Sequence, residues 1–233
     1  MPKLYYHDFS RLGFHNRQLP GIFAPNQEAK MPVICAYIML AIAKLRCEGE
    51  REISFAELFC ADAFYSIFAR KWGADTAVGI DNDRDGYLRL ASVARKRAGV
   101  PDVQLVRGDV MELPTNIKYS IVANVGGLYH VEDPVRVLRH SWELSSGFLI
   151  VQSAVSMAND DPAYFETPAP GWDWGSRFNR RSFQRMVERE GYNVIDSAFN
   201  ELTGNERLED RGKRLLPDKE SAVRRRSAAG CAP

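Results

Sequence analysis

The chain has 233 residues, of which 45% are hydrophobic and 26% charged, a balance that excludes a disordered or fibrous chain. Its formal net charge of +1 lacks the overall basicity of dedicated nucleic-acid-binding proteins. Its longest apolar stretch, residues 33–43, is too short to span a bilayer, and the start shows no secretory signal, so we expect a soluble cytoplasmic protein without membrane contact.

The first 26 residues show no clear periodicity but carry His7, His15 and several aromatic side chains. They are interpreted either as a lid over a ligand site or as an irregular extension that packs its aromatics on the core. Residues 27–45 predict a helix, because apolar residues recur there at helical spacing. Residues 1–49 are therefore treated as an N-terminal extension and helix.

A strand, a tight turn and a second strand follow. Residues 53–59 predict a short buried strand, small residues form the turn, and a helix opens near Ala63. Residues 76–80 predict a second strand that ends on Asp81. This arrangement is typical of nucleoside-containing cofactor sites, because the turn lets the backbone approach the ligand and the carboxylate accepts hydrogen bonds from ribose hydroxyls.

Further strands alternate with helices along the chain. The acidic run 81–85 suits the start of a helix, and Asp133-Pro134 marks another helix start. Later strands are predicted at residues 103–106, 119–124, 148–152, 192–199 and 213–216. The pattern predicts an α/β fold with a Rossmann-like, doubly wound, seven-stranded sheet.

Right-handed crossovers place the carboxyl ends of these strands on one edge of the sheet, where such folds bind ligands. The residues best suited to chemistry converge there, namely Asp62, Asp81, Asp109, Asn124, Tyr129, His130 and Ser153. No metal-ligand triad stands out, so we expect no metal.

The last third of the chain contains a long insertion, residues 156–178, rich in proline, aspartate and aromatics. It is interpreted as a substrate wall or lid, or alternatively as a loop whose aromatics cap the core. A helix is predicted from Arg180 to Glu190, and residues 217–233 are expected to form a mobile tail.

This series of elements resembles the class I S-adenosylmethionine-dependent methyltransferases over residues 50–216. Short motifs, Gly127-Leu128-Tyr129-His130 with Asp133-Pro134 and later Arg177-Phe178, resemble the bacterial wobble-uridine tRNA carboxymethyltransferase group within that superfamily. The resemblance implies S-adenosylmethionine as cofactor and a methyltransferase domain over those residues.

The resemblance also implies a role for each matching position. The cofactor-binding residues would be Glu57, Phe59, Cys60, Ala61 and Asp62 for the methionine moiety, Asp81 with the adjacent Asn82 for the ribose, Asp109 and Val110 for adenine, and Asn124, Val125 and Gly126 at the methyl-donor end. Tyr129 and His130 would face the acceptor as catalytic residues. His130 is the candidate base, because imidazole titrates near neutral pH; the alternative is a structural hydrogen bond or a helix cap.

The first loop departs from the superfamily pattern. Phe59, Ala61 and Ala63 stand where these enzymes usually have glycine. A Cβ atom penalises positive φ, so the loop geometry must differ from the usual one or be strained.

The working hypothesis is O-methylation of a small-molecule acceptor, such as a secondary metabolite or a sugar-like compound. A first alternative is a tRNA-modifying methyl- or carboxymethyltransferase, for which Arg181, Arg185 and Arg189 would offer a basic helix face. A second alternative is a non-catalytic adenosyl-binding module, suggested by the altered first loop. The sequence does not specify the oligomeric state.

Overall fold

The computed structural model describes residues 4–200 and the backbone of residues 222–224. The described chain forms two compact units. The first comprises residues 4–127 and 136–151, and the second comprises residues 128–135 and 152–200, with residues 222–224. Within these described residues, none of the helices combines the length and the apolar character needed to cross a membrane.

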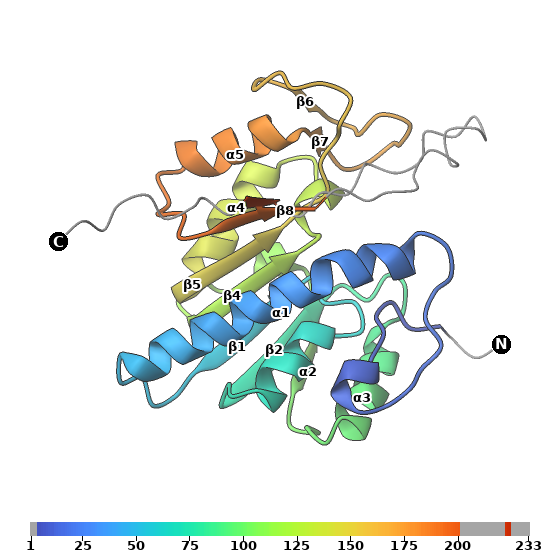
Figure 1. Cartoon of the computed structure of the whole chain (residues 1–233), viewed down its shortest axis with the longest axis vertical. Helices are drawn as coiled ribbons and strands as arrows, with labels where there is room; N and C mark the ends of the chain where they lie inside the picture. The colour runs from blue at the N-terminus through green and yellow to red at the C-terminus, as the bar shows by residue number, and fades with distance from the viewer. Residues whose placement is uncertain (1–3, 201–221, 225–233) are drawn as a thin grey trace. The chain divides into compact units, whose positions relative to one another are not determined.

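A five-stranded sheet organises the first unit, in the order β3-β2-β1-β4-β5 (Figure 1). Its strands are β1 (Ser54–Leu58), β2 (Thr76–Asp81), β3 (Gln104–Arg107), β4 (Tyr119–Val125) and β5 (Ser145–Gln152). β1 pairs in parallel with both β2 and β4, and β2 pairs in parallel with β3. The Rossmann-like α/β fold with a central parallel sheet is therefore confirmed.

The predicted count of seven strands is not confirmed. Of residues 192–199, only Ser197–Phe199 form a strand, β8, which pairs antiparallel with β9 (Ala222–Arg224) in a separate two-stranded sheet. Val194 and Ile195 carry strong β propensity but are exposed, and propensity alone does not supply a partner strand. Three residues of the predicted tail form β9; the predicted strand 213–216 and the rest of the tail lie outside the described residues.

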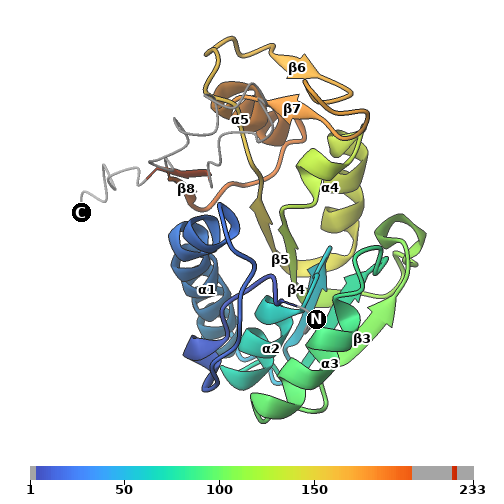
Figure 2. The ribbon, with the colours of Figure 1, turned by 90° about the vertical axis from the view of Figure 1, so that its right-hand side faces the viewer.

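Side chains of the central strands alternate between two apolar layers, as expected for a sheet covered on both faces. Phe55 and Ile121 join the layer that holds α1 (Phe23–Cys47), α2 (Phe64–Lys71) and α3 (Leu88–Arg97), shown beside the strands in Figure 2. Ala56 and Val122, one residue further along, join the opposite layer. The N-terminal segment belongs to the first layer through buried residues such as Phe9 and Leu12.

Two helices begin away from their predicted starts. α1 begins four residues early, at Phe23, because Pro25 falls in its first turn, where a missing N–H costs nothing. α3 begins at Leu88, after the acidic run. Side chains in that run accept hydrogen bonds from nearby backbone N–H groups, which favours a turn over a helix. Asp83 nevertheless serves the helix, since its Oδ1 accepts from Leu88 N at 2.9 Å.

The second unit contains a short 3-10 helix at Leu128–His130, the start of α4 (Pro134–Glu143) and helix α5 (Arg180–Arg189). α4 begins at the predicted proline. α5 is held by a capping box, in which Asn179 and Ser182 exchange hydrogen bonds between side chain and backbone. The predicted insertion contains a strand pair, β6 (Phe165–Glu166) with β7 (Arg177–Phe178).

Candidate functional site

The loop after β1 keeps the backbone geometry of a glycine-rich turn although it contains no glycine. φ is 58° at Phe59, 48° at Ala61 and 57° at Ala63, all in the left-handed region. For residues with a Cβ this conformation costs about 1–2 kcal/mol each. The loop is therefore strained, one of the two outcomes expected from the sequence.

Neighbouring strand ends leave the space that this loop needs. A Cβ on Gly79 of β2 would lie 3.0 Å from both the Ala63 Cβ and the Cys60 Sγ, so the strand carries the glycine on which the loop packs. Cys60 itself is buried, and its N–H donates to Ile80 O at 3.1 Å.

The Phe59 ring lies against Gly127, just beyond β4. A Cβ on Gly127 would overlap this ring and would lie 2.5 Å from Asn124 Oδ1. Asn124 is fully buried; its Nδ2 donates to Ser141 Oγ at 3.0 Å, and its Oδ1 accepts from Gly127 N at 3.2 Å. The Phe59 ring thus joins the ends of β1 and β4, and the Asn124 amide holds the end of β4 to α4.

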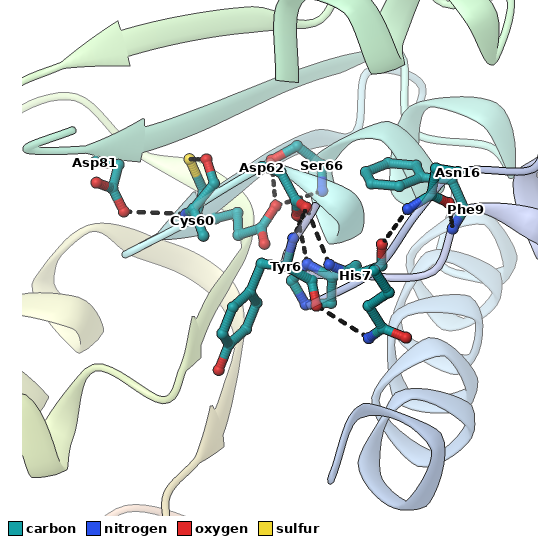
Figure 3. Close-up of polar contacts among 11 residues, drawn as sticks. Tyr6, His7, Phe9, Asn16, Cys60, Asp62, Ser66 and Asp81 are labelled. Carbon is teal, nitrogen blue, oxygen red and sulfur yellow. Dashed lines mark hydrogen bonds and ion pairs between the residues drawn. The ribbon is translucent and has the colours of Figure 1, made fainter. Parts of the chain in front are cut away.

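Asp81 ends β2 with its carboxylate turned to the loop. Its Oδ2 accepts from Ala61 N at 3.0 Å (Figure 3). Its Oδ1 accepts from Asp83 N at 2.7 Å. A carboxylate offers about four lone-pair positions, so these two bonds leave capacity for further donors. Asp81 is partly exposed, as a group that meets a ligand should be.

Asp62 is fully buried and is bound by the N-terminal segment instead of facing an open site. It accepts from Tyr6 N at 2.7 Å, from His7 N at 3.0 Å and, through Oδ1, from the His7 ring at Nδ1, 2.5 Å away (Figure 3). His7 therefore contacts the loop, while the aromatic side chains of the same segment pack on the core. His15 is exposed and offers its carbonyl oxygen to Arg97.

Glu57 is also buried, and its described partners belong to α2. Its Oε2 accepts from Ser66 N at 2.7 Å and from Ser66 Oγ at 2.8 Å. Desolvation raises the pKa of Glu57 from an ordinary 4.5 to about 8, against the lowering effect of the Ser66 hydrogen bonds. The carboxyl group thus carries a proton over most of the neutral range.

Glu57 makes the stability of the protein depend on pH. The folded state holds the Glu57 proton more tightly than the unfolded chain, so the resulting stabilisation is complete below about pH 4.5 and is lost as the pH rises to about 8. We expect the free energy of unfolding to fall over this interval with a slope of up to about 1.4 kcal/mol per pH unit.

Urea unfolding of the wild type and of Glu57→Gln between pH 5 and pH 8.5 measures this slope, and Glu52→Gln, at an exposed position, is the matched control. Glu57→Gln should flatten the pH dependence, whereas Glu52→Gln should leave it unchanged. Parallel curves for the wild type and Glu57→Gln would contradict the assignment.

The remaining predicted cofactor residues lie at the same edge of the sheet. The strand register pairs Leu58 with both Ile80 and Asn124, and pairs Asp81 with Arg107, so four strand ends are neighbours. The exposed Asp109 follows β3 and accepts from Met111 N at 2.8 Å. The structure thereby brings together the predicted set, Glu57, Phe59, Cys60, Ala61, Asp62, Asp81, Asn82, Asp109, Val110, Asn124, Val125 and Gly126, within the first unit.

Tyr129 and His130, the predicted catalytic pair, lie in the second unit. Their ring centroids are 4.3 Å apart, and His130 stacks on Trp174 of the insertion at 5.2 Å with an interplanar angle of 6°. Desolvation raises the pKa of Tyr129 to about 12, so its phenol stays protonated at neutral pH and can donate a hydrogen bond but cannot act as a base.

A groove of about 520 Å³ opens on the second unit, with apolar and charged residues in its walls. Tyr164, Phe165, Phe178 and Met186 are among its apolar residues, and Arg185 is among its charged ones. Mixed linings of this kind suit small molecules. The predicted basic face of α5 is exposed at Arg181, Arg185 and Arg189.

Sequence reasoning missed how the N-terminal segment is used. The hydrogen bonds from Tyr6 and His7 to Asp62 join residues more than fifty positions apart and come from a segment without regular periodicity. The only signal was the density of aromatic residues around His7. The packing role of Gly79 was also missed, although a lone glycine in an apolar strand often marks close backbone approach.

No protein-family model matches the chain, and no curated protein matches its sequence. Solved structures do match. The N-terminal domain of EvdMO1, crystallised with SAH and D-fucose, is similar with a TM-score of 0.61 and 19% identity over 95% of this chain and 89% of that one.

Magnesium protoporphyrin IX methyltransferase (ChlM) from Synechocystis PCC 6803, with bound SAH, matches with a TM-score of 0.56 and 15% identity over 93% of this chain and 92% of that one. The [4+2]-cyclase SpnF matches with a TM-score of 0.56 and 12% identity over 73% of this chain and 60% of that one. These matches show a fold of the class I methyltransferase type, and they give no support to the wobble-uridine tRNA group.

Proposed function

We propose that this protein is a methyltransferase that binds S-adenosylmethionine at the carboxyl edge of the sheet in the first unit. The observation that carries this proposal is the backbone of the loop Phe59–Ala63. Three of its residues adopt the left-handed conformation, which is unfavourable for residues with a Cβ, and the loop lies beside the carboxylate of Asp81. Strain that persists in a ligand loop points to function. ChlM, which shares the fold, has been crystallised with bound SAH and with bound SAM.

The residues at the end of β2 are suited to bind the ribose of this cofactor. Asp81 has lone pairs left for two ribose hydroxyls, and the small side chain of Ala61 allows the backbone to approach the ligand. The carboxyl groups of Asp62 and Glu57 are already hydrogen-bonded to His7 and Ser66, so we expect the loop backbone to contact the methionine moiety. Asp109 and Asn124 follow the neighbouring strands and would border the adenine and the methyl-donor end.

Methyl transfer needs alignment more than bond activation by the protein. A bound cofactor would supply its sulfonium methyl group to the acceptor oxygen, with the S–CH3 bond replaced by an O–CH3 bond and S-adenosylhomocysteine as the leaving group. An acceptor hydroxyl also gives up a proton. His130 is our candidate for that base, and the protonated Tyr129 is our candidate donor of a hydrogen bond to the acceptor.

A small hydroxylated acceptor is our proposal for the substrate. The near-neutral charge of the chain and the mixed lining of the groove in the second unit support this class. The EvdMO1 domain was crystallised in the presence of D-fucose, a sugar. The RNA alternative rests on the exposed arginines of α5, which more often form a solvated helix face than a phosphate track.

Calorimetric titration with S-adenosylmethionine and S-adenosylhomocysteine tests the cofactor assignment, and we expect micromolar dissociation constants for both. Transfer of labelled methyl to a panel of sugars and phenols then tests the acceptor class. Absence of binding by folded protein would overturn the proposal. Binding without turnover on this panel, together with tRNA affinity that falls steeply with salt, would favour the RNA alternative.

A further inference from the structure

The strained loop needs support from elsewhere in the chain, because its own residues do not favour its conformation. On the side of β2, Asp81 holds the Ala61 N–H and Ile80 O accepts from the Cys60 N–H. On the other side Asp62, which lies between the left-handed Ala61 and Ala63, is held by residues 6 and 7. The loop is thus clamped from both sides at adjacent residues.

The segment that clamps Asp62, residues 5–18, is itself closed by hydrogen bonds, and we call it the strap. Its two ends are joined because Tyr5 N donates to Arg17 O at 2.9 Å. Asn16 braces its middle, accepting from Phe9 N and donating to His7 O, each at 2.8 Å. The strap therefore presents His7 to Asp62 in a preformed shape.

The strap is anchored to the core through aromatic contacts. The His7 ring stacks on Phe64, the first residue of α2, at 5.2 Å, and it meets Tyr65 edge-on at 5.3 Å. Phe9 and His7 are both buried. The strap thus makes three hydrogen bonds to Asp62, just before α2, and one ring stack on Phe64, the first residue of α2.

We propose that His7 is a positioning residue, through which the strap holds the cofactor loop in the left-handed conformation that glycines would otherwise permit. The inference rests on the proposed cofactor site and deepens it. In this chain the geometry of the loop is supplied from outside the loop, by Asp81 of β2 and by the strap, which holds Asp62. This coupling predicts that the strap contributes less to cofactor affinity when Ala61 and Ala63 are replaced by glycine.

A double-mutant comparison tests the coupling. His7→Leu removes the hydrogen bond from the ring to Asp62 and the stack on Phe64, both in the natural loop and in a loop carrying Ala61→Gly and Ala63→Gly. The dissociation constant for S-adenosylhomocysteine is measured in all four proteins. We expect His7→Leu to weaken binding about tenfold or more in the natural loop, and threefold or less in the glycine loop. His7→Asn, whose amide can still donate to Asp62, should restore most of the affinity.

Equal losses in both loops, or no loss in either, would overturn the proposal. If His7→Leu does not fold, Asn16→Ala gives the same comparison, because it loosens the strap and leaves the buried ring in place. If the wild type binds no adenosyl ligand, the proposed function fails, and hydrogen exchange decides the inference alone. The amides of Cys60 and Ala63 should then exchange about tenfold faster in His7→Leu with the natural loop only; unchanged exchange would refute the clamp.

Discussion

Asp81→Ala should weaken binding of S-adenosylhomocysteine about 100-fold. Two hydrogen bonds from ribose hydroxyls to a carboxylate are together worth about 3 kcal/mol, which corresponds to this factor. Calorimetric titration of the wild type and the variant measures the change. The same carboxylate also holds Ala61 N and Asp83 N, so loss of affinity alone does not separate ribose contact from loop support.

A change in the ligand distinguishes contact of Asp81 with the ribose from support of the loop by Asp81. The wild type should prefer the adenosyl ligand over its 2′,3′-dideoxy counterpart by about tenfold or more, because only the former carries the hydroxyls. Asp81→Ala should bind the two almost equally. Retention of the full preference in the variant would show that Asp81 supports the loop and does not bind the ribose.

Gly127→Ala should both destabilise the first unit and impair the cofactor site. The new Cβ would overlap the Phe59 ring and crowd Asn124 Oδ1, so either the ring or the end of β4 must move. Overpacking of this kind costs about 1–3 kcal/mol, and the free energy of unfolding in urea should fall by that amount. Affinity for S-adenosylhomocysteine should fall at least about tenfold, since the shifted backbone lies at the proposed methyl-donor end.

Gly108→Ala is the matched control, because Gly108 also follows a strand of the same sheet but has nothing within 4 Å of the added Cβ. It should be close to neutral. Phe59→Ala in the Gly127→Ala protein removes the overlapping ring and should recover part of the lost affinity. A Gly127→Ala protein as stable and as tight-binding as the wild type would contradict the described packing.

Much of the sheet could be predicted from sequence because its strands carry the signal themselves. Continuous apolar runs such as residues 76–80 mark strands covered on both faces, and Asp81 follows directly at a strand end. The convergence of the predicted cofactor residues then follows from parallel pairing and right-handed crossovers. The same local reasoning predicted α4 from Asp133-Pro134.

The rest depends on contacts that are distant in sequence. Nothing local distinguishes residues 192–196 from a strand, since strand formation also requires a neighbour. The role of His7 depends on a hydrogen bond across 55 residues, and no spacing rule anticipates it. The loop shows the limit most clearly: from Phe59, Ala61 and Ala63 alone, a strained copy of the glycine geometry and a different geometry were equally admissible.

The reactivity of the buried Cys60 thiol reports whether the strained loop is closed or open. Desolvation first, and then the negative charges of Glu57, Asp81 and Asp62, raise the pKa of Cys60 well above its ordinary value, so the reactive thiolate is suppressed while the loop is closed. Cys47, at the exposed end of α1, reacts without any such opening. The rate of alkylation of Cys60, divided by that of Cys47, therefore measures how often the loop opens from its left-handed conformation.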